Sequence, residues 1–184
     1  MGRRVFISGA TGYVGSRVAA ELISHGWHVR ALTRRGSEQK LPSKAEPVFG
    51  NALHAFTFGL SVPTCDTYIH LVGTPHPAPW KGEQFRAIDL VSLKASVEAA
   101  LQAHVEHFVY MSVAHPAPVM KDYIAVRAEC EQHIRDAGLT ATILRPWYVL
   151  GPGHRWPYAL IPVYKLMDLI PSTRESARRL GLVT

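Results

Sequence analysis

The 184-residue sequence predicts an α/β protein built on a doubly wound parallel sheet, with helices on both faces and a small C-terminal extension. Short apolar runs, several of which end in glycine, alternate with longer segments of helical periodicity. Each run is apolar almost throughout, which is typical of strands that are buried on both faces. The first run passes directly into a glycine-rich turn and then a helix. Such strands pair in parallel through right-handed crossovers, and ligands bind at their carboxyl ends.

The first half of the chain contributes four strands. Residues 3–9 are largely β-branched and aromatic and end in glycine, as expected for a buried strand. From Val14 onward, apolar residues recur at helical spacing, and Gly26 ends that helix. Residues 51–60 are weakly helical. The other strands of this half are expected at residues 27–33, 46–50 and 66–73.

The second half alternates long helices with two more strands. Residues 82–105 are rich in alanine and periodic over their whole length, so we expect one long helix there. A further helix carries Tyr123 and runs to Gly138. The fifth and sixth strands are expected at residues 107–113 and 139–146.

Composition argues against several classes of protein. The formal net charge is +6, but lysine and arginine occur as scattered pairs, so we expect no nucleic-acid partner and favour an enzyme that binds anionic ligands. The two cysteines and ten histidines show no metal-ligand spacing, and we assign no metal. No apolar run approaches the ~20 residues that span a bilayer, and the first strand leaves no room for a signal peptide. We therefore expect a cytoplasmic protein.

Gly9, Gly12 and Gly15 stand at the junction of the first strand and the first helix. Their G-x-x-G-x-x-G spacing differs by one residue from the dinucleotide fingerprint, but the physical role is the same. Gly9 allows a tight turn, Gly12 lets the backbone approach a pyrophosphate, and Gly15 lets helix and strand pack closely. The helix N-terminus then offers unpaired N–H groups to the phosphates. In this strand–turn–helix context, the motif predicts nucleotide binding.

The end of the second strand indicates which dinucleotide binds. An NAD site usually places a carboxylate there for the ribose 2′-hydroxyl, whereas this strand ends Thr33-Arg34-Arg35 and has no acid before Glu38. Arginines bind a 2′-phosphate that a carboxylate would repel. We predict NADP as the cofactor, with NAD as the alternative. A solvated pair of arginines with no cofactor role is the other interpretation.

Five segments resemble the short-chain dehydrogenase/reductase superfamily, in its extended and atypical branches. They are GATGYVG (9–15), IHLVG (69–73), FVYMS (108–112), Tyr123-x-x-x-Arg127 and ILRPWYVLGPG (143–153). The chain looks most similar to NAD(P)-binding proteins described as NmrA-like or complex-I-accessory-subunit-like, and more distantly to NAD-dependent epimerases and dehydratases. The resemblance implies a Rossmann fold and an NAD(P)-dependent oxidoreductase.

The resemblance also implies roles for individual positions. Backbone N–H groups of Tyr13 and Val14 would bind the pyrophosphate, and Asn51 stands where the family usually has an aspartate that contacts adenine. Pro146 would approach the nicotinamide. Together with the glycine turn and the two arginines, the expected cofactor-binding set is Gly9, Thr11, Gly12, Tyr13, Val14, Gly15, Thr33, Arg34, Arg35, Asn51, Leu71, Val72, Gly73, Arg127 and Pro146.

Tyr123, Ser112 and Arg127 are the catalytic residues that the resemblance implies. In the family, a serine orients the substrate carbonyl, a tyrosine exchanges the proton, and a lysine four residues later binds the nicotinamide ribose. Arg127 replaces that lysine, and it keeps the charge but cannot relay a proton. The cleft asparagine of the family is also missing, and Asp89 stands nearest its place. Three loop histidines are alternative proton donors, namely His76, His115 and His154.

Three functions remain in competition. The first is hydride transfer between NADP(H) and a small carbonyl, alcohol or quinone-like substrate. The second is a non-catalytic NAD(P)-binding redox sensor or accessory subunit, which Arg127 in place of lysine favours. The third, a nucleotide-sugar epimerase or dehydratase, needs a sizeable sugar-binding lobe and ranks last.

The chain is expected to divide near residue 150. Residues 1–150 would form the dinucleotide-binding Rossmann domain, and residues 151–184 a short substrate lobe packed on it, either minimal or incomplete at Thr184. Apolar residues within 158–170 share one helical face, which is seldom left open. We expect that face to pack on the body or on a second copy, which would give a homodimer or a larger assembly.

Overall fold

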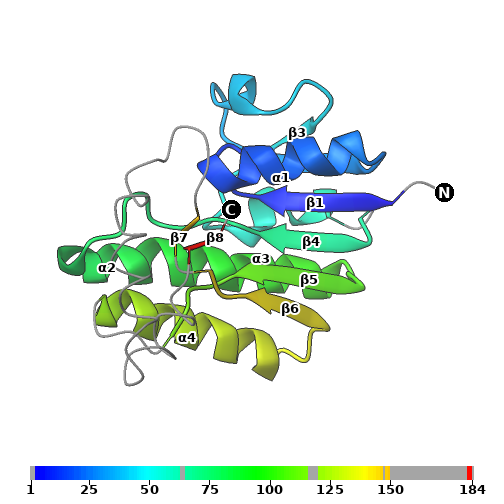
Figure 1. Ribbon diagram of the computed structural model, residues 1–184. Coiled ribbons are helices and arrows are strands. Elements are labelled where there is room, and N and C mark those ends of the chain that lie inside the picture. The colour runs from blue at the N-terminus through cyan, green and yellow to red at the C-terminus, as the bar shows by residue number, and fades with distance from the viewer. Residues whose placement is uncertain (1–2, 63–64, 116–119, 147, 150–181, 184) are drawn as a thin grey trace.

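The computed structural model describes residues 3–62, 65–115, 120–146, 148–149 and 182–183. Its centre is a six-stranded parallel sheet in the order β3-β2-β1-β4-β5-β6 (Figure 1). The strands are β1 (Arg4–Ser8), β2 (His28–Thr33), β3 (Glu46–Phe49), β4 (Thr67–His70), β5 (His107–Met111) and β6 (Ala141–Leu144). The connections run outward from β1 to β3 and then return to β4, so the topological switch point lies between β1 and β4. The predicted doubly wound α/β fold is confirmed.

The two faces of the sheet bury different residues, because successive side chains of a strand point to opposite sides. Val5 and Ile7 of β1 pack on the face that α1 covers. Phe6, Tyr68 and Phe108 form a row of aromatic rings on the other face, with centroids 5.1 and 5.3 Å apart, and there they pack with apolar residues of α3 and α4. The helices that cover the sheet are α1 (Tyr13–Ser24), α3 (Val91–Gln102) and α4 (Lys121–Asp136).

The long helix expected at residues 82–105 is not uniform. A short α2 (Gly82–Gln84) leads into a π-helical segment, Phe85–Leu90, before α3 begins. The wider π-helical turn brings residues four and five apart onto one face, so Phe85, Asp89 and Leu90 are all buried. Residues 51–60 likewise form two short 3-10 turns, η2 (Ala55–Thr57) and η3 (Gly59–Ser61), rather than a helix.

The carboxyl ends of the strands gather at one edge, on the left in Figure 1. The loops after β1, β4 and β5 begin at this edge. Helix α2 and a 3-10 turn, η4 (Pro79–Lys81), lie beside it. The predicted substrate lobe, 151–184, lies outside the described residues except for β8 (Leu182–Val183), which pairs in parallel with β7 (Tyr148–Val149). The face predicted within 158–170 also lies outside them.

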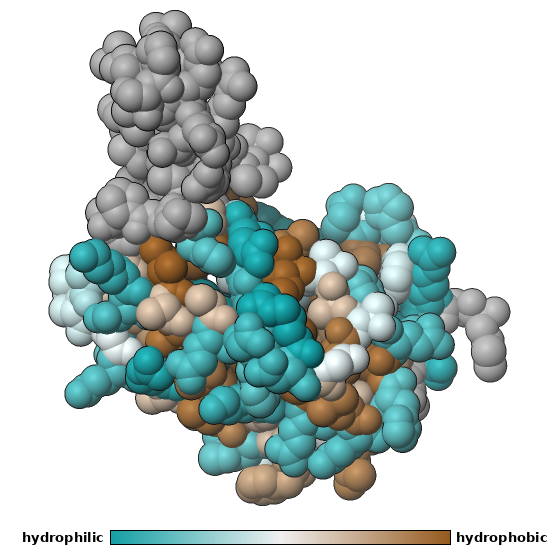
Figure 2. Space-filling model, turned by 90° about the horizontal axis from the view of Figure 1, so that it is seen from below, coloured by the Kyte–Doolittle hydropathy of each residue, from teal (hydrophilic) through white to brown (hydrophobic). Residues whose placement is uncertain are grey.

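The surface is mixed in polarity. Figure 2 shows polar side chains over most of the face that it presents, with apolar side chains interspersed. None of the helices in the described part of the chain combines the length and the apolarity that a membrane crossing requires.

Candidate functional site

The glycine turn after β1 is closed by backbone contacts that exclude side chains. Gly9 has φ +85, and a Cβ there would lie 2.6 Å from the carbonyl carbon of Leu71. A Cβ on Gly15 would lie 2.1 Å from the Gly9 carbonyl oxygen, so α1 starts directly against the turn. The Gly12 N–H donates to that same oxygen at 3.1 Å. Gly9 and Gly15 therefore have the packing roles that their spacing predicted.

The N-terminus of α1 is open to an anion. Gly12 is its N-cap residue, no side chain caps the helix, and its first turn contains no acidic residue. The first N–H groups of a helix have no partner within the helix, and their dipoles favour negative charge. Thr11, Tyr13 and Val14 are half-buried around this end, and the Tyr13 carbonyl accepts a 2.7 Å hydrogen bond from Arg17. A backbone cradle of this shape, in which side chains would collide, fits the pyrophosphate of a dinucleotide.

The end of β2 presents two exposed cations. Thr33 is buried, whereas Arg34 and Arg35 are exposed at the carboxyl edge. The Arg35 guanidinium lies over the Phe49 ring, 4.9 Å from its centroid. Within the described residues neither arginine forms an ion pair, so both charges are free to meet a phosphate.

Asn51 has a local structural role. The side-chain oxygen of Asn51 accepts from the Leu53 N–H at 3.0 Å, and the backbone N–H of Asn51 donates to the Thr57 hydroxyl at 2.9 Å. These bonds close the turn after β3. The side chain is exposed at the same edge, and its oxygen already has a backbone partner.

The segment after β4 continues the ladder beside the glycine turn. Leu71 donates its N–H to the Ser8 carbonyl at 2.9 Å, and its backbone packs against Gly9. Val72 is half-buried beside it. Gly73 leaves space for a side chain from α4, because a Cβ there would lie 2.4 Å from Nη2 of Arg127. The predicted positions 71–73 thus lie between the glycine turn and Arg127.

Arg127 is buried at the centre of the candidate site, with 5% of its surface exposed. Its Nη2 donates to Oδ1 of Asp89 at 2.7 Å, and its Nη1 donates to the Tyr110 hydroxyl at 3.1 Å and to the Met111 carbonyl at 2.9 Å. Its buried Nε has no partner among the described residues. Burial opposes the charge, but Tyr123, Tyr110 and Asp89 outweigh it and raise the pKa of Arg127, so the guanidinium stays protonated.

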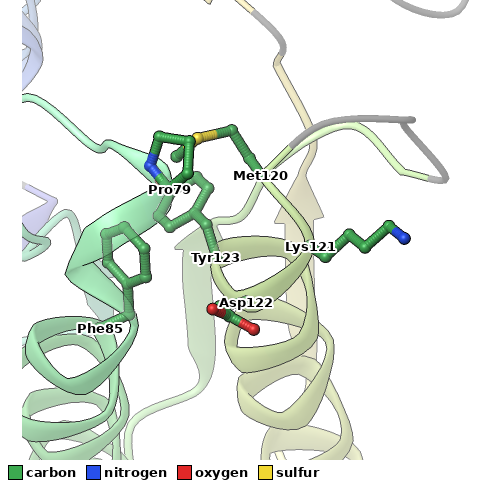
Figure 3. Close-up of a pocket in the computed structure, with 6 residues that line it drawn as sticks. All are labelled: Pro79, Phe85, Met120, Lys121, Asp122 and Tyr123. Atoms are coloured by element: carbon green, nitrogen blue, oxygen red, sulfur yellow. The ribbon is translucent and has the colours of Figure 1, made fainter.

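Tyr123 lies one turn before Arg127 on α4 and faces a pocket lined by both apolar and charged residues. Its ring centroid is 4.9 Å from that of Phe85, and the Arg127 guanidinium carbon is 5.0 Å from it. Figure 3 shows Tyr123 pointing toward Pro79 and Phe85, with Met120 beside it and Lys121 pointing away. The pocket has a volume of about 340 Å³. Burial raises the pKa of the Tyr123 hydroxyl, the charge of Arg127 opposes that rise, and the charge of Asp89 adds to it. A neutral phenol in such a pocket can donate a proton.

Ser112 contacts a different turn of α4. Its hydroxyl donates to Oε1 of Glu131 at 2.6 Å, and Glu131 is two helical turns beyond Tyr123. Arg145 binds the same carboxylate through Nε at 2.9 Å and through Nη2. Burial raises the pKa of Glu131, but hydrogen bonds from Arg145 and Ser112 outweigh it and lower that pKa to about 2. The Ser112 hydroxyl is therefore engaged away from Tyr123, and its substrate role stays a prediction.

The remaining predicted residues are dispersed around this edge. The Pro146 carbonyl accepts from the Ala114 N–H at 3.0 Å, which extends the β5–β6 ladder. His76 is exposed, with φ +48. His115 lies 3.4 Å from the Glu131 carboxylate, and His154 is outside the described residues. Among those residues, no cluster of histidine, cysteine or carboxylate side chains could hold a metal ion.

Sequence reasoning missed the partners of the central residues. Tyr110 and Ser112 are two residues apart, which places them on one face of an extended strand, and Glu131 follows Arg127 by one turn on α4. These two spacings could have predicted that Tyr110 and Glu131 lie at the site. A second buried polar group was missed as well, because His70, fully buried, bonds the hydroxyls of Ser8 and Ser96 through Nδ1 at 3.0 and 2.9 Å. Burial, with Arg127 nearby, lowers the pKa of His70 to about 3, so it is neutral.

The family profile described as NAD(P)H-binding matches residues 9–159. The chain belongs to this NAD(P)H-binding family. The match confirms the expected NAD(P)-binding domain. Together with the relatives and the solved structures below, it confirms the predicted resemblance to the short-chain dehydrogenase/reductase superfamily.

Two curated relatives are reductases. The chain is 26% identical to "Ceramide reductase" of Caulobacter vibrioides, over 95% of this chain and 55% of the relative. It is also 26% identical to the "4-hydroxy-2-methyl-3-oxo-4-farnesyl-3,4-dihydroquinoline-1-oxide ketoreductase" of Stigmatella aurantiaca, over 93% of this chain and 56% of the relative. The chain thus spans little more than half the length of these two relatives.

Solved structures of similar fold include UDP-glucose 4-epimerase of Thermotoga maritima, which superposes with a TM-score of 0.71 at 18% identity, over 90% of this chain and 62% of that chain. The Bordetella bronchiseptica enzyme WbmH, solved in complex with NAD+, superposes with a TM-score of 0.72 at 20% identity, over 92% of this chain and 63% of that chain. At this identity the likeness is one of fold.

Proposed function

We propose that the protein is an NADP(H)-dependent reductase of an apolar ketone or quinone-like compound, in which Tyr123 donates the proton. The observation that carries the proposal is the position of Tyr123. Its ring lines a pocket of mixed polarity at the carboxyl edge of the sheet and packs on Arg127, which in turn lies against Gly73 beside the glycine turn. A carbonyl held in that pocket would be next to the predicted cofactor cradle.

The chain's own residues divide the work. Gly9, Gly12 and the N-terminus of α1 bind the pyrophosphate, while Arg34 and Arg35 bind the 2′-phosphate that distinguishes NADP from NAD. When bound, the reduced nicotinamide supplies the hydride that the carbonyl carbon accepts. The Tyr123 hydroxyl would hold the carbonyl oxygen and give it the proton that completes the alcohol, and the phenolate left on Tyr123 would take a proton back from solvent.

The residues around the Tyr123 ring support a substrate with an apolar portion. Pro79, Phe85 and Met120 surround the ring, while Lys121 and Asp122 border the same pocket, so apolar contacts would hold the substrate and a few polar groups would orient it. The two reductase relatives are named for a ceramide and for a farnesyl-substituted dihydroquinoline, which are both largely apolar compounds. This chemistry favours a ketoreductase over a nucleotide-sugar epimerase, although the fold is common to both.

Cys65 and Cys130 are both buried, which fits a reducing compartment such as the cytoplasm. Residues 151–184 complete the substrate pocket, and the apolar face within 158–170 packs on the body or on a second copy. NAD remains the alternative cofactor, and a non-catalytic redox sensor or accessory subunit is the alternative function.

The test compares wild type with Tyr123→Phe on a panel of apolar ketones and quinones with NADPH. Tyr123→Phe should lower kcat by roughly 100-fold or more and leave NADPH affinity nearly unchanged, because the hydroxyl acts chiefly in the transition state. Equal turnover by the two proteins would remove Tyr123 from the mechanism. Nucleotide binding without turnover of any substrate would favour the sensor or accessory-subunit alternative.

A further inference from the structure

Asp89 is a buried carboxylate that has no role in the proposed reaction. Only 1% of its surface is exposed, and the two oxygens share three donors. Oδ1 accepts from Nη2 of Arg127 at 2.7 Å, and Oδ2 accepts from the N–H and the hydroxyl of Thr74 at 2.9 and 2.6 Å. A buried charge is costly unless it is paired and hydrogen-bonded. This carboxylate satisfies both conditions.

The ion pair joins four elements around Tyr123. Asp89 belongs to the π-helical segment, Thr74 to the loop after β4, and Arg127 to α4, while the other end of the guanidinium bonds to Tyr110 of β5. Gly73 provides the space through which Arg127 passes. The guanidinium is therefore held in one orientation under the Tyr123 ring, with its charge opposed by a carboxylate at contact distance.

Several titratable groups face Tyr123 from the elements packed against it. Arg127 and Cys130 lie on α4, Asp89 on the π-helical segment, and Tyr110 on β5, next to Arg127. Lys121 and Asp122 border the pocket. Only Arg127 and Asp89 are both charged and buried, so solvent screens them least. The field at the phenol is set mainly by the difference between these two charges.

We propose that Asp89 is a positioning residue, which pairs with Arg127 so that Tyr123 remains a protonated phenol. An uncompensated Arg127 would stabilise the phenolate and suit the residue to accept a proton. The compensated pair keeps the phenol protonated over a wider pH range, and a protonated donor is the requirement for reducing a carbonyl. This inference rests on the proposed function for its meaning, but the protonation state can be measured without any substrate.

The test is a spectroscopic titration of Tyr123. Phenolate absorbance is followed with pH in wild type and in Asp89→Asn, and the Tyr123 signal is isolated by subtracting the same titration of the matching Tyr123→Phe protein. The pKa of Tyr123 should fall by about one unit or more in Asp89→Asn, a tenfold change in the ionisation equilibrium. Thr74→Val is the matched control, because it removes a hydrogen bond from Asp89 but keeps both charges. It should leave the Tyr123 titration unchanged.

If Asp89→Asn does not fold, the double variant Asp89→Asn/Arg127→Gln removes both charges together. The pKa of Tyr123 should then be no lower than in wild type, because the loss of Arg127 removes the charge that lowers it and burial still raises it. A fall in that pKa in the double variant contradicts the proposal. So does an unchanged titration in folded Asp89→Asn, or an equal shift in Thr74→Val.

Activity distinguishes this inference from the proposed function. With a substrate in hand, the falling limb of the kcat profile should move to lower pH in Asp89→Asn, because less Tyr123 is protonated there. A shifted titration in a protein that turns over no ketone or quinone supports the role of Asp89 and contradicts the reductase proposal.

Discussion

Nη2 of Arg127 lies 2.7 Å from Oδ1 of Asp89, in a pair that is almost fully buried. These are the two positions near Tyr123 at which the chain departs from the short-chain dehydrogenase/reductase pattern, where lysine and asparagine are expected. The structure shows that the departures meet. A carboxylate in place of the amide provides the partner that a guanidinium in place of the amine needs. The two substitutions therefore form one compensated unit beneath Tyr123.

Gly73→Ala should disrupt this unit without changing a charge. The new Cβ would lie 2.4 Å from Nη2 of Arg127 and 3.4 Å from Oδ1 of Asp89, so the guanidinium must move. We expect a loss of about 2–4 kcal/mol in the free energy of unfolding, from overpacking and a weakened buried pair. Urea denaturation measures it. Gly59→Ala is the control, because the nearest atom to its Cβ is 3.8 Å away. Similar losses in both variants would show that space for Arg127 is not what Gly73 provides.

The sequence predicted the sheet better than the centre of the site. Apolar runs and the glycine turn indicate the strands and the doubly wound fold through local patterns, and the structure confirms both. The π-helical segment has no local signature, because it forms where Phe85 and Asp89 must both face inward. The Asp89–Arg127 pair joins residues 38 positions apart, so helical spacing alone could not reveal it. Ser112 was paired in the prediction with Tyr123, but its bond to Glu131 depends on how α4 crosses β5.

Arg34 and Arg35 should determine the choice between NADPH and NADH. Both are exposed beside the end of β2, without ion-pair partners among the described residues. Changing both to alanine should weaken NADPH binding by about 2–4 kcal/mol and barely alter NADH binding, because charge-assisted bonds to the 2′-phosphate are lost. Calorimetric titration of each nucleotide measures this. Lys40→Ala, an exposed cation in η1 (Glu38–Lys40), is the control. Equal losses for both nucleotides would contradict the assignment.

Glu131 should make the protein sensitive to acid. Its pKa is about 2 in the folded chain against an ordinary 4.5, so its contribution is present above pH 4.5 and is lost as pH falls toward 2. The shift corresponds to about 3 kcal/mol. Glu131→Gln should flatten the dependence of unfolding free energy on pH in that window. Glu129→Gln, at an exposed carboxylate paired with Arg86, should leave the slope unchanged. If both variants match wild type, the Glu131–Arg145 pair does not stabilise the fold.

In the proposed reaction, a hydride from the nicotinamide is delivered to a carbonyl carbon beside Tyr123. The most direct test uses NADPH that carries deuterium at C4 of the nicotinamide, together with an apolar ketone that the wild-type protein turns over. Mass spectrometry should find one deuterium on the carbinol carbon of the product, formed by wild type and nearly absent with Tyr123→Phe. If the protein binds NADPH tightly but forms an alcohol without deuterium on that carbon, or no alcohol from any ketone, the proposed reaction is wrong.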